Sequence, residues 1–187
     1  LQSRAMAVQD DNNYFSTELG TLSETGADTD IAIRGDGFFI VQGLGDPSLS
    51  RRGDLRVNAE GILENGTSQK MLDAALQPIQ VPAHRAIKVS EDGDVIIEPL
   101  GSDPGTEQLV ARLAMTLAEG GELNKFADGE IRLEDGTVPP ISADMRIVAK
   151  HLELSNVNVT EELINSIEDQ RAYEINVKMI TSASELD

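Results

Sequence analysis

The chain ends in the segment LELSNVNVTEELINSIEDQRAYEINVKMITSASELD, residues 152–187. Asn158 is placed to cap a helix, because Glu161 follows three residues later and gives the spacing of a reciprocal capping box. Thr160 is an alternative cap. From here to Asp187 the pattern predicts one helix of about 28 residues, or about 42 Å at 1.5 Å per residue. Such a helix is longer than a small β domain needs, and it is typical of a subunit of a fibre or tube.

Apolar side chains surround much of this predicted helix. They form one stripe in its first half and cover most of the circumference in its second half: Val159, Leu163, Ile164 and Ile167, then Ala172, Tyr173, Ile175, Val177, Met179 and Ile180. A helix that is apolar on several sides is buried on several sides, and no other helix is predicted in this chain. We therefore expect its partners to be a segment upstream of Leu1, other copies of the chain, or both. The alternative is a helix folded back on its own sheet.

The rest of the chain reads as short strands joined by tight turns. Hairpin chemistry occurs where glycine, which tolerates positive φ, lies between two apolar runs. The predicted turns are 35–37 (between strands 31–34 and 38–41), 58–61 (between 51–57 and 62–63), 65–66, 91–94 (between 87–89 and 95–97) and 135–136. The other predicted strands are 70–72, 78–82, 109–117, 131–133 and 145–154. Segment 78–82 is edge-like, because its prolines cannot donate to a central ladder. The predicted fold class is mainly β, an antiparallel β domain of hairpins followed by one long C-terminal helix.

Three regions are predicted along the chain. Residues 1–30 are polar and form an extended lead-in linker, residues 31–154 form the β-rich domain, and residues 155–187 form the junction and the long helix. A loop of Gly, Pro and Asp at 101–105 marks the clearest internal break. The chain begins at Leu1 without a signal-peptide pattern, so we expect further residues upstream of it.

Composition excludes several classes of function. The 187 residues are 40% apolar but only 3% aromatic, and they carry a formal net charge of −18. This charge repels phosphate backbones, so neither nucleic acid nor an anionic membrane is an expected partner. The chain has no Cys, which excludes disulfides, thiol nucleophiles and thiolate metal sites. No apolar run is long enough to cross a bilayer.

No catalytic, cofactor or metal site is predicted. His84 and His151 are the only two histidines and lie far apart in the sequence, so neither reads as a ligand or a base. Phosphate-binding loops and nucleophile motifs are absent from the sequence. The acidic runs at 28–30 and 91–94 do not reproduce a Ca²⁺ loop with its distal Glu. We therefore expect a protein that is not an enzyme.

Two Arg-Gly-Asp tripeptides raise a second hypothesis. Arg34-Gly35-Asp36 and Arg52-Gly53-Asp54 would suit a β-domain adhesion or binding module. Both lie where the pattern predicts turns, and a turn needs the glycine for its backbone geometry. The turn interpretation is therefore favoured over adhesion.

Several blocks of the chain resemble the bacterial flagellar rod and hook protein family. The segments that carry the resemblance are 152–158 (LELSNVN), 161–164 (EELI) and 170–176 (QRAYEIN) at the C-terminal end, and 30–41 (DIAIRGDGFFIV), 52–55 (RGDL) and 58–63 (NAEGIL) in the body. They occur in family order and cover most of the chain outside 83–145. Leu55 stands where relatives often carry Phe.

The resemblance implies a structural subunit that passes unfolded through the flagellar export apparatus and assembles helically into the rod. In that family the N- and C-terminal helices build an inner tube in the periplasm and the β domain lies outside it. The family's N-terminal helix is not in this chain. The expected partners are other rod and hook subunits and copies of the chain itself, with no membrane insertion.

Within the family the chain looks most like the proximal-rod protein. This likeness is carried by the lead-in around 4–6, the compact middle and segment 123–132. Segment 170–173 resembles the distal-rod relative instead. A distal-rod or hook subunit is therefore the alternative. The family's Asn-Val-Asn junction motif falls on Asn156, Val157 and Asn158. The predicted assembly interface consists of Leu163, Ile164, Ile167, Arg171, Tyr173, Ile175, Val177 and Ile180.

Overall fold

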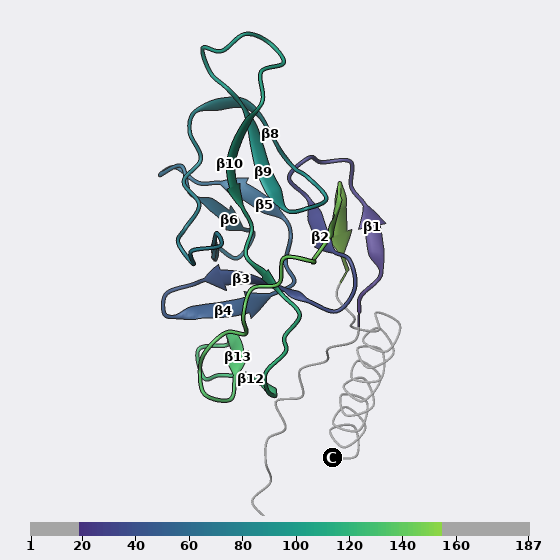
Figure 1. Ribbon diagram of the computed structural model, residues 1–187, viewed down its shortest axis with the longest axis vertical. Helices are drawn as coiled ribbons and strands as arrows, with labels where there is room; N and C mark the ends of the chain where they lie inside the picture. Colours follow the sequence, from purple (N-terminus) through teal and green to yellow (C-terminus); the bar gives the residue numbers. More distant parts are fainter. Residues whose placement is uncertain (1–18, 155–187) are drawn as a thin grey trace, which may run out of the picture. The chain divides into compact units, whose positions relative to one another are not determined.

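The computed structural model describes residues 19–154, which form fifteen short strands and no helix (Figure 1). The chain divides into two compact units between Leu154 and Ser155. The mainly antiparallel β prediction is confirmed for the described residues. Residues 1–18 and 155–187 lie outside them, and with them the predicted helix and its cap. The long C-terminal helix stays a prediction.

The largest sheet has eight strands around the long central strand β3. Its order is β12-β13-β4-β3-β7-β6-β5, and β11 also pairs with β3. The strands are β3 (Phe38–Gln42), β4 (Pro47–Ser50), β5 (Leu55–Val57), β6 (Leu63–Asn65), β7 (Lys70–Met71), β11 (Met115–Thr116), β12 (Leu123–Lys125) and β13 (Ile131–Leu133). All of its pairs are antiparallel.

Strand β3 is buried on both faces, because successive side chains of a strand point to opposite sides. Phe39 and Val41 belong to the larger apolar cluster of the body. Phe38 and Ile40 belong to a second, smaller cluster together with Leu49. The apolar run at 38–41 therefore shows no polar alternation, since both of its faces contribute to a core.

A second sheet of three strands covers the larger cluster. It consists of β8 (His84–Val89), β9 (Asp94–Pro99) and β10 (Gln108–Arg112), in the order β10-β9-β8. Val89, Val95 and Ile97 are buried in the same cluster as Phe39, so the two sheets share one core. Figure 1 shows this sheet as a layer beside the strands β3 to β6.

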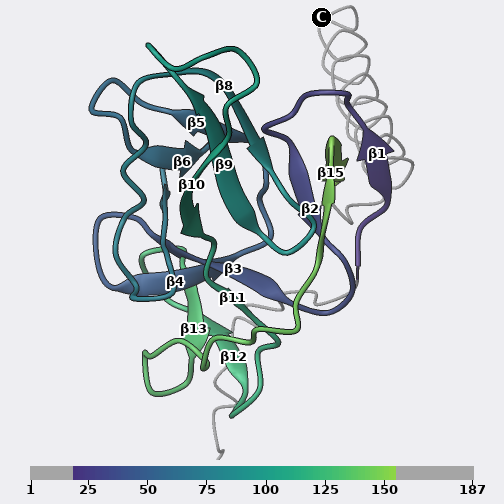
Figure 2. The ribbon, with the colours of Figure 1, turned by 45° about the horizontal axis from the view of Figure 1, so that its top comes forward.

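Two antiparallel two-stranded ribbons complete the body. Strand β2 (Ile31–Ile33) pairs with β14 (Ile147–Ala149), and β1 (Leu22–Glu24) pairs with β15 (His151–Glu153). In both ribbons a strand from the start of the described chain pairs with a strand from its end (Figure 2). Lys150, with φ of 62°, lies between β14 and β15.

The two hairpins predicted around 58–61 and 91–94 are confirmed. Val57 pairs with Leu63 across the first turn, and Val89 pairs with Val95 across the second. Gly61 and Gly93 have φ of 81° and 85°, which explains why glycine is needed there. The turn after Asn65 also forms, although Ser68 rather than Gly66 has positive φ, at 63°.

The hairpin predicted around 35–37 is wrong. The chain bends there and Gly35 has φ of 84°, but β2 does not pair with β3. Strand β2 pairs instead with β14, and β3 pairs with β4, β7 and β11. The physical reason is burial: Ile31, Ala32 and Ile33 are all at most 1% exposed, and partners distant in the sequence provide that cover.

Two predicted long strands are each divided in two. Segment 109–117 becomes β10 and β11, because the chain passes from one sheet to the other at Leu113 and Ala114, with the Ala114 N–H donating to Leu72 O at 2.8 Å. Segment 145–154 becomes β14 and β15. Segment 78–82 forms isolated bridges instead of a strand, and its Ile79 and Val81 are buried in the larger cluster. Loop 101–105 joins β9 and β10, which pair with each other, so both of its sides lie in one unit.

Candidate assembly junction

The predicted junction motif begins two residues after Leu154, the last described residue, and the predicted interface follows it. Asn156, Val157, Asn158 and all the predicted interface side chains lie outside residues 19–154, so their roles stay predictions. The structure does describe the place on the body to which residues 155–187 are attached. We call this place the junction ribbon, and it consists of β1, β15 and the flanking residues Leu19–Thr21 and Leu154.

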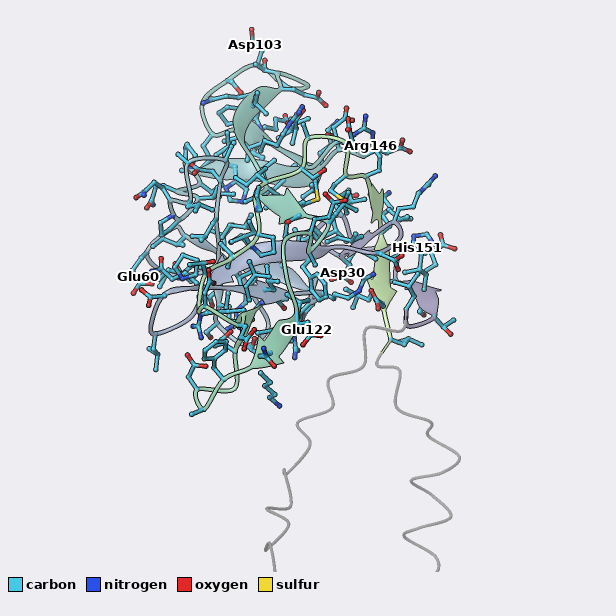
Figure 3. All side chains as sticks on the ribbon, turned by 60° about the horizontal axis from the view of Figure 1, so that its bottom comes forward. Asp30, Glu60, Asp103, Glu122, Arg146 and His151 are labelled. Atoms are coloured by element: carbon cyan, nitrogen blue, oxygen red, sulfur yellow. The ribbon has the colours of Figure 1, made fainter. Side chains whose placement is uncertain are left out.

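The junction ribbon brings the two ends of the described chain side by side. Leu22 is opposite Glu153, and Glu24 is opposite His151. The Leu154 N–H donates to Thr21 O at 2.8 Å, and the Thr25 N–H donates to Lys150 O at 2.8 Å. His151, labelled in Figure 3, marks β15 in this ribbon. The described part of the chain therefore begins and ends at adjacent positions on the body.

Gly20 lets the two backbones of the ribbon approach each other closely. A Cβ at this position would lie 2.0 Å from Leu154 O and 2.8 Å from Glu153 Cγ. Because no real Cβ tolerates such distances, any side chain at residue 20 would force the backbones of residues 20 and 154 apart. The Gly20 N–H also donates to Glu153 Oε1 at 2.9 Å.

Arg51 connects the junction ribbon to the body. Its Nη2 and Nε lie 2.5 and 2.6 Å from Glu153 Oε2. Its other donors reach the chain between β2 and β3: Nη1 donates to Gly35 O at 3.1 Å and to Gly37 O, and Nη2 donates to Ile33 O at 3.5 Å. The guanidinium also lies over the Phe38 ring, 5.9 Å from its centroid.

The Arg51–Glu153 ion pair is largely removed from water. The two side chains are 17% and 10% exposed. Both oxygens of Glu153 accept hydrogen bonds, one from Arg51 and the other from the Gly20 N–H. A buried pair with its polar atoms satisfied holds its partners in one geometry, whereas removing one partner leaves an uncompensated charge. The arrangement thus holds Gly20 and Glu153 of the junction ribbon in one geometry against Arg51 of the body.

Gly53 provides a second close approach beside the junction ribbon. The Ile31 N–H donates to Gly53 O at 2.9 Å, and a Cβ on Gly53 would lie 1.7 Å from Ile31 O. Its φ is not positive, so glycine is needed here for space rather than for a turn. This contact positions β2, which in turn holds β14 and the start of the junction ribbon.

The two Arg-Gly-Asp tripeptides have different environments. Arg34, Gly35 and Asp36 lie on an exposed bend, as predicted. The second tripeptide is not at a turn, because Gly53 is packed against Ile31.

The charged groups of the second tripeptide bind each other: Arg52 Nε and Nη2 donate to Asp54 at 2.7 and 2.9 Å. Partial burial favours the neutral acid of Asp54, but the hydrogen bonds from Arg52 and the Gly66 N–H outweigh it and lower the pKa of the carboxyl. The side chains of Arg52 and Asp54 are thus engaged within the body.

The histidines serve local backbone contacts. His84 Nδ1 is 2.8 Å from Pro82 O, and His151 Nδ1 is 2.9 Å from Ala149 O. Among residues 19–154 no group of three or more His, Asp or Glu side chains is arranged to hold a metal ion. The same residues contain no helix that could cross a membrane.

The roles of Arg51 and Glu153 were not predicted from the sequence. They are separated by 102 residues, and no local pattern links them. The available signal was weak: Glu153 is an acid between two leucines in a predicted strand, and a buried acid needs a partner. Nothing in the sequence chooses Arg51 over the neighbouring Arg52 for that partner.

Two family models match the chain. The flagellar hook protein FlgE/F/G D1 domain matches residues 32–97, which include β3 to β8 and the Arg51 region. The C-terminal region of the flagellar basal body rod FlgEFG proteins matches residues 148–187, which include β15 with Glu153. The two partners of the ion pair therefore come from two separately matched regions.

Individual proteins are also similar over most of the chain. The flagellar basal-body rod protein FlgF of Salmonella typhimurium is 32% identical over 173 residues, covering 89% of this chain and 68% of the relative. FlgF of Caulobacter vibrioides is 33% identical, with 89% and 66% covered. FlgG of Buchnera aphidicola subsp. Baizongia pistaciae is 34% identical, with 89% and 65% covered. The chain thus spans about two thirds of the length of these relatives.

Proposed function

Because this chain belongs to the bacterial flagellar basal-body rod protein family and is a structural subunit of the rod, we propose that it forms the proximal part of that rod. Two observations favour the proximal assignment. The relatives named FlgF, the proximal-rod type, include those of Salmonella typhimurium, Caulobacter vibrioides and Escherichia coli. Segment 123–132, which resembles the proximal-rod protein, forms β12, β13 and the turn between them. The distal rod is the alternative, since FlgG relatives reach 34% identity.

The observation that carries the proposed assembly is the junction ribbon. Leu154 bonds to Thr21, so the segments before and after the described body begin next to each other. Terminal segments that start side by side can pair along their length, and the β body is then held on the outside of the resulting tube. In this proposal residues 155–187 form the predicted helix and contribute to that tube.

The tube contacts are proposed to come from the apolar surface of this helix. Its buried side chains are Leu163, Ile164, Ile167, Tyr173, Ile175, Val177 and Ile180, with Arg171 at the interface and Asn156, Val157 and Asn158 at the junction with the body. Burying an aliphatic side chain contributes about 1.5–3 kcal/mol. Six such residues contribute on the order of 10 kcal/mol before the entropic cost of association.

The protein interacts with other flagellar rod and hook subunits, as its family membership indicates. We add the proposal that it passes unfolded through the export apparatus on its way to the rod. The composition suits such transit, because a chain without Cys has no disulfide to break before it unfolds. The proposed role is mechanical and needs no catalytic residues, because the rod transmits torque through contacts between its subunits.

The order of assembly tests the proximal assignment. A proximal subunit is added before the distal rod, so it does not need the distal subunit for its own incorporation. We expect this protein to remain in basal bodies isolated from cells that lack the distal-rod protein, and we expect the distal-rod protein to be absent from basal bodies of cells that lack this protein. Immunoblots of the two preparations measure both.

The opposite order would contradict the proximal assignment. If this protein were lost from basal bodies whenever the distal-rod protein is missing, it would belong to the distal rod or hook. The control is a strain that lacks the filament subunit only, in which both rod proteins should be present in normal amounts.

A further inference from the structure

A groove lies beside the junction ribbon, and Arg51, which binds Glu153 of the ribbon, also lines the groove. Its volume is about 530 Å³, within the range of about 300–1,000 Å³ typical of pockets that hold a ligand. Phe38, Leu117, Ala118 and Leu123 form its apolar lining. Leu117 is 41% exposed, which is unusual for a leucine next to a core strand.

The polar rim of the groove includes Arg51, Asp36 and Glu122. Figure 3 labels Glu122 at the edge of the body. The Arg51 guanidinium already lies over the Phe38 ring, and the opposite face of a guanidinium can stack on a second aromatic ring. Carboxylates on the same rim accept hydrogen bonds from a phenol hydroxyl. An aromatic side chain with a hydroxyl next to it therefore suits the whole lining.

The chain itself carries such a pair of side chains, Tyr14 and Phe15, a few residues before the junction ribbon in the sequence. Gly20 is bound through its N–H to Glu153, and the other oxygen of Glu153 binds Arg51, which lines the groove. The Glu153 carboxylate thus links Gly20 to Arg51, so the chain at residue 20 lies one side chain away from the lining of the groove. Phe15 precedes Gly20 by five residues, a span of at most about 18 Å. Tyr14 and Phe15 are therefore tethered within reach.

We propose that this groove binds the Tyr14–Phe15 pair of the same chain. The Phe15 ring packs against Leu117 and Leu123, and the Tyr14 hydroxyl donates to a rim carboxylate. Asp36 and Glu122 repel the neighbouring acidic run Asp10–Asp11, so the aromatic pair enters the groove and the acidic run stays outside it. The consequence is a second anchor for the lead-in, in addition to Gly20, which fixes its direction as it leaves the body. This inference does not depend on the proximal assignment or on the tube contacts.

Tryptophan fluorescence tests the proposal directly, because the chain has no Trp of its own. In the full-length Phe15→Trp protein we expect emission at a shorter wavelength than that of free tryptophan. Adding Leu117→Glu to this variant should move the emission to the solvent value. The matched control adds Leu109→Glu, at a leucine that is 61% exposed on β10, and should leave the emission unchanged. Both glutamates replace exposed leucines, so circular dichroism should show the body folded in each.

Two fluorescence results would overturn the proposal. The first is solvent-like emission from Phe15→Trp that Leu117→Glu does not alter. The second is an emission shift caused by Leu117→Glu in a Tyr173→Trp protein but not in the Phe15→Trp protein. That result would mean that the C-terminal segment occupies the groove instead.

Engineered cysteines provide an independent measurement, since the chain has no Cys. Under mild oxidation the full-length Phe15→Cys/Leu117→Cys protein should form a disulfide within one chain, seen as a monomer with changed mobility on a non-reducing gel. The Phe15→Cys/Leu109→Cys control should stay reduced under the same conditions. If the first pair formed disulfide-linked dimers only, a second copy would occupy the groove and the proposal would be wrong. If both pairs oxidised equally, no specific docking would exist.

Discussion

Replacing Ile167 or Ile175 with aspartate is expected to abolish incorporation of the protein into the rod while the β body stays folded. Each isoleucine is proposed to be buried between helices, where it contributes about 1.5–3 kcal/mol. The aspartate loses this contribution and adds an unpaired charge, which costs several kcal/mol more when it is buried. The loss recurs in every subunit of the rod. Immunoblots of isolated basal bodies measure incorporation, and swimming in soft agar measures the consequence.

The same charge on the other side of the predicted helix provides the control. Asn165 is about 180° from the centre of the apolar stripe at 3.6 residues per turn, so Asn165→Asp should assemble normally. Thermal denaturation should show the same melting of the β body in all three variants, because the substituted residues belong to the second compact unit. Wild-type incorporation and motility of Ile167→Asp and Ile175→Asp would refute the proposed interface.

Replacing Arg51 with methionine is expected to destabilise the β body and to loosen the junction ribbon. Methionine keeps most of the apolar stem but leaves Glu153 without its cation. Breaking a buried pair in this way costs about 3–5 kcal/mol. The lower value is expected here, because the two side chains retain 17% and 10% exposure. At roughly 2–4 °C per kcal/mol, the melting temperature should fall by about 6–12 °C.

Hydrogen exchange shows where Arg51→Met acts. Exchange should become faster in the junction ribbon, at residues 20–25 and 151–154, more than in the β8–β9 hairpin. A double-mutant cycle with Glu153→Gln should give a coupling energy above about 1 kcal/mol, as expected for residues in direct contact.

The Arg85–Glu98 pair is the matched control for this cycle. It joins β8 to β9 at 2.9 Å, but its side chains are 37% and 26% exposed. Exposed pairs contribute little to stability, so Arg85→Met should leave the melting temperature nearly unchanged. Equal effects of Arg51→Met and Arg85→Met would show that the Arg51 pair has no special part in holding the junction ribbon.

The parts of the fold that the sequence predicted correctly are those with local signals. The hairpins at 58–61 and 91–94 each have a glycine with positive φ between two apolar runs, and both form as expected. The bend at Gly35 has the same local chemistry. It fails to make a hairpin because β2 is completed by β14, more than one hundred residues away. Turn chemistry predicts where a chain bends, but not which strands pair after the bend.

The candidate site was predictable only in part for a similar reason. Position 153 lay in the predicted strand 145–154, and the structure places it in β15. Its ion pair with Arg51 and the approach of Gly20 to Leu154 are contacts between the start and the end of the chain. Such contacts leave no periodic signal, since each depends on one or two residues. Gly53 shows the same limit: the sequence indicated a turn, whereas the residue is needed to make room for Ile31.

Hydrogen exchange of residues 155–187 tests the central claim most directly, because that claim is burial of this segment by other subunits. The measurement compares the full-length protein as a dilute monomer with the same protein in isolated basal bodies. Exchange throughout 155–187 should be fast in the monomer and slow in the assembled rod. Equally strong protection of the segment in the monomer would mean that one chain covers its own apolar residues, and it would contradict assembly through this helix.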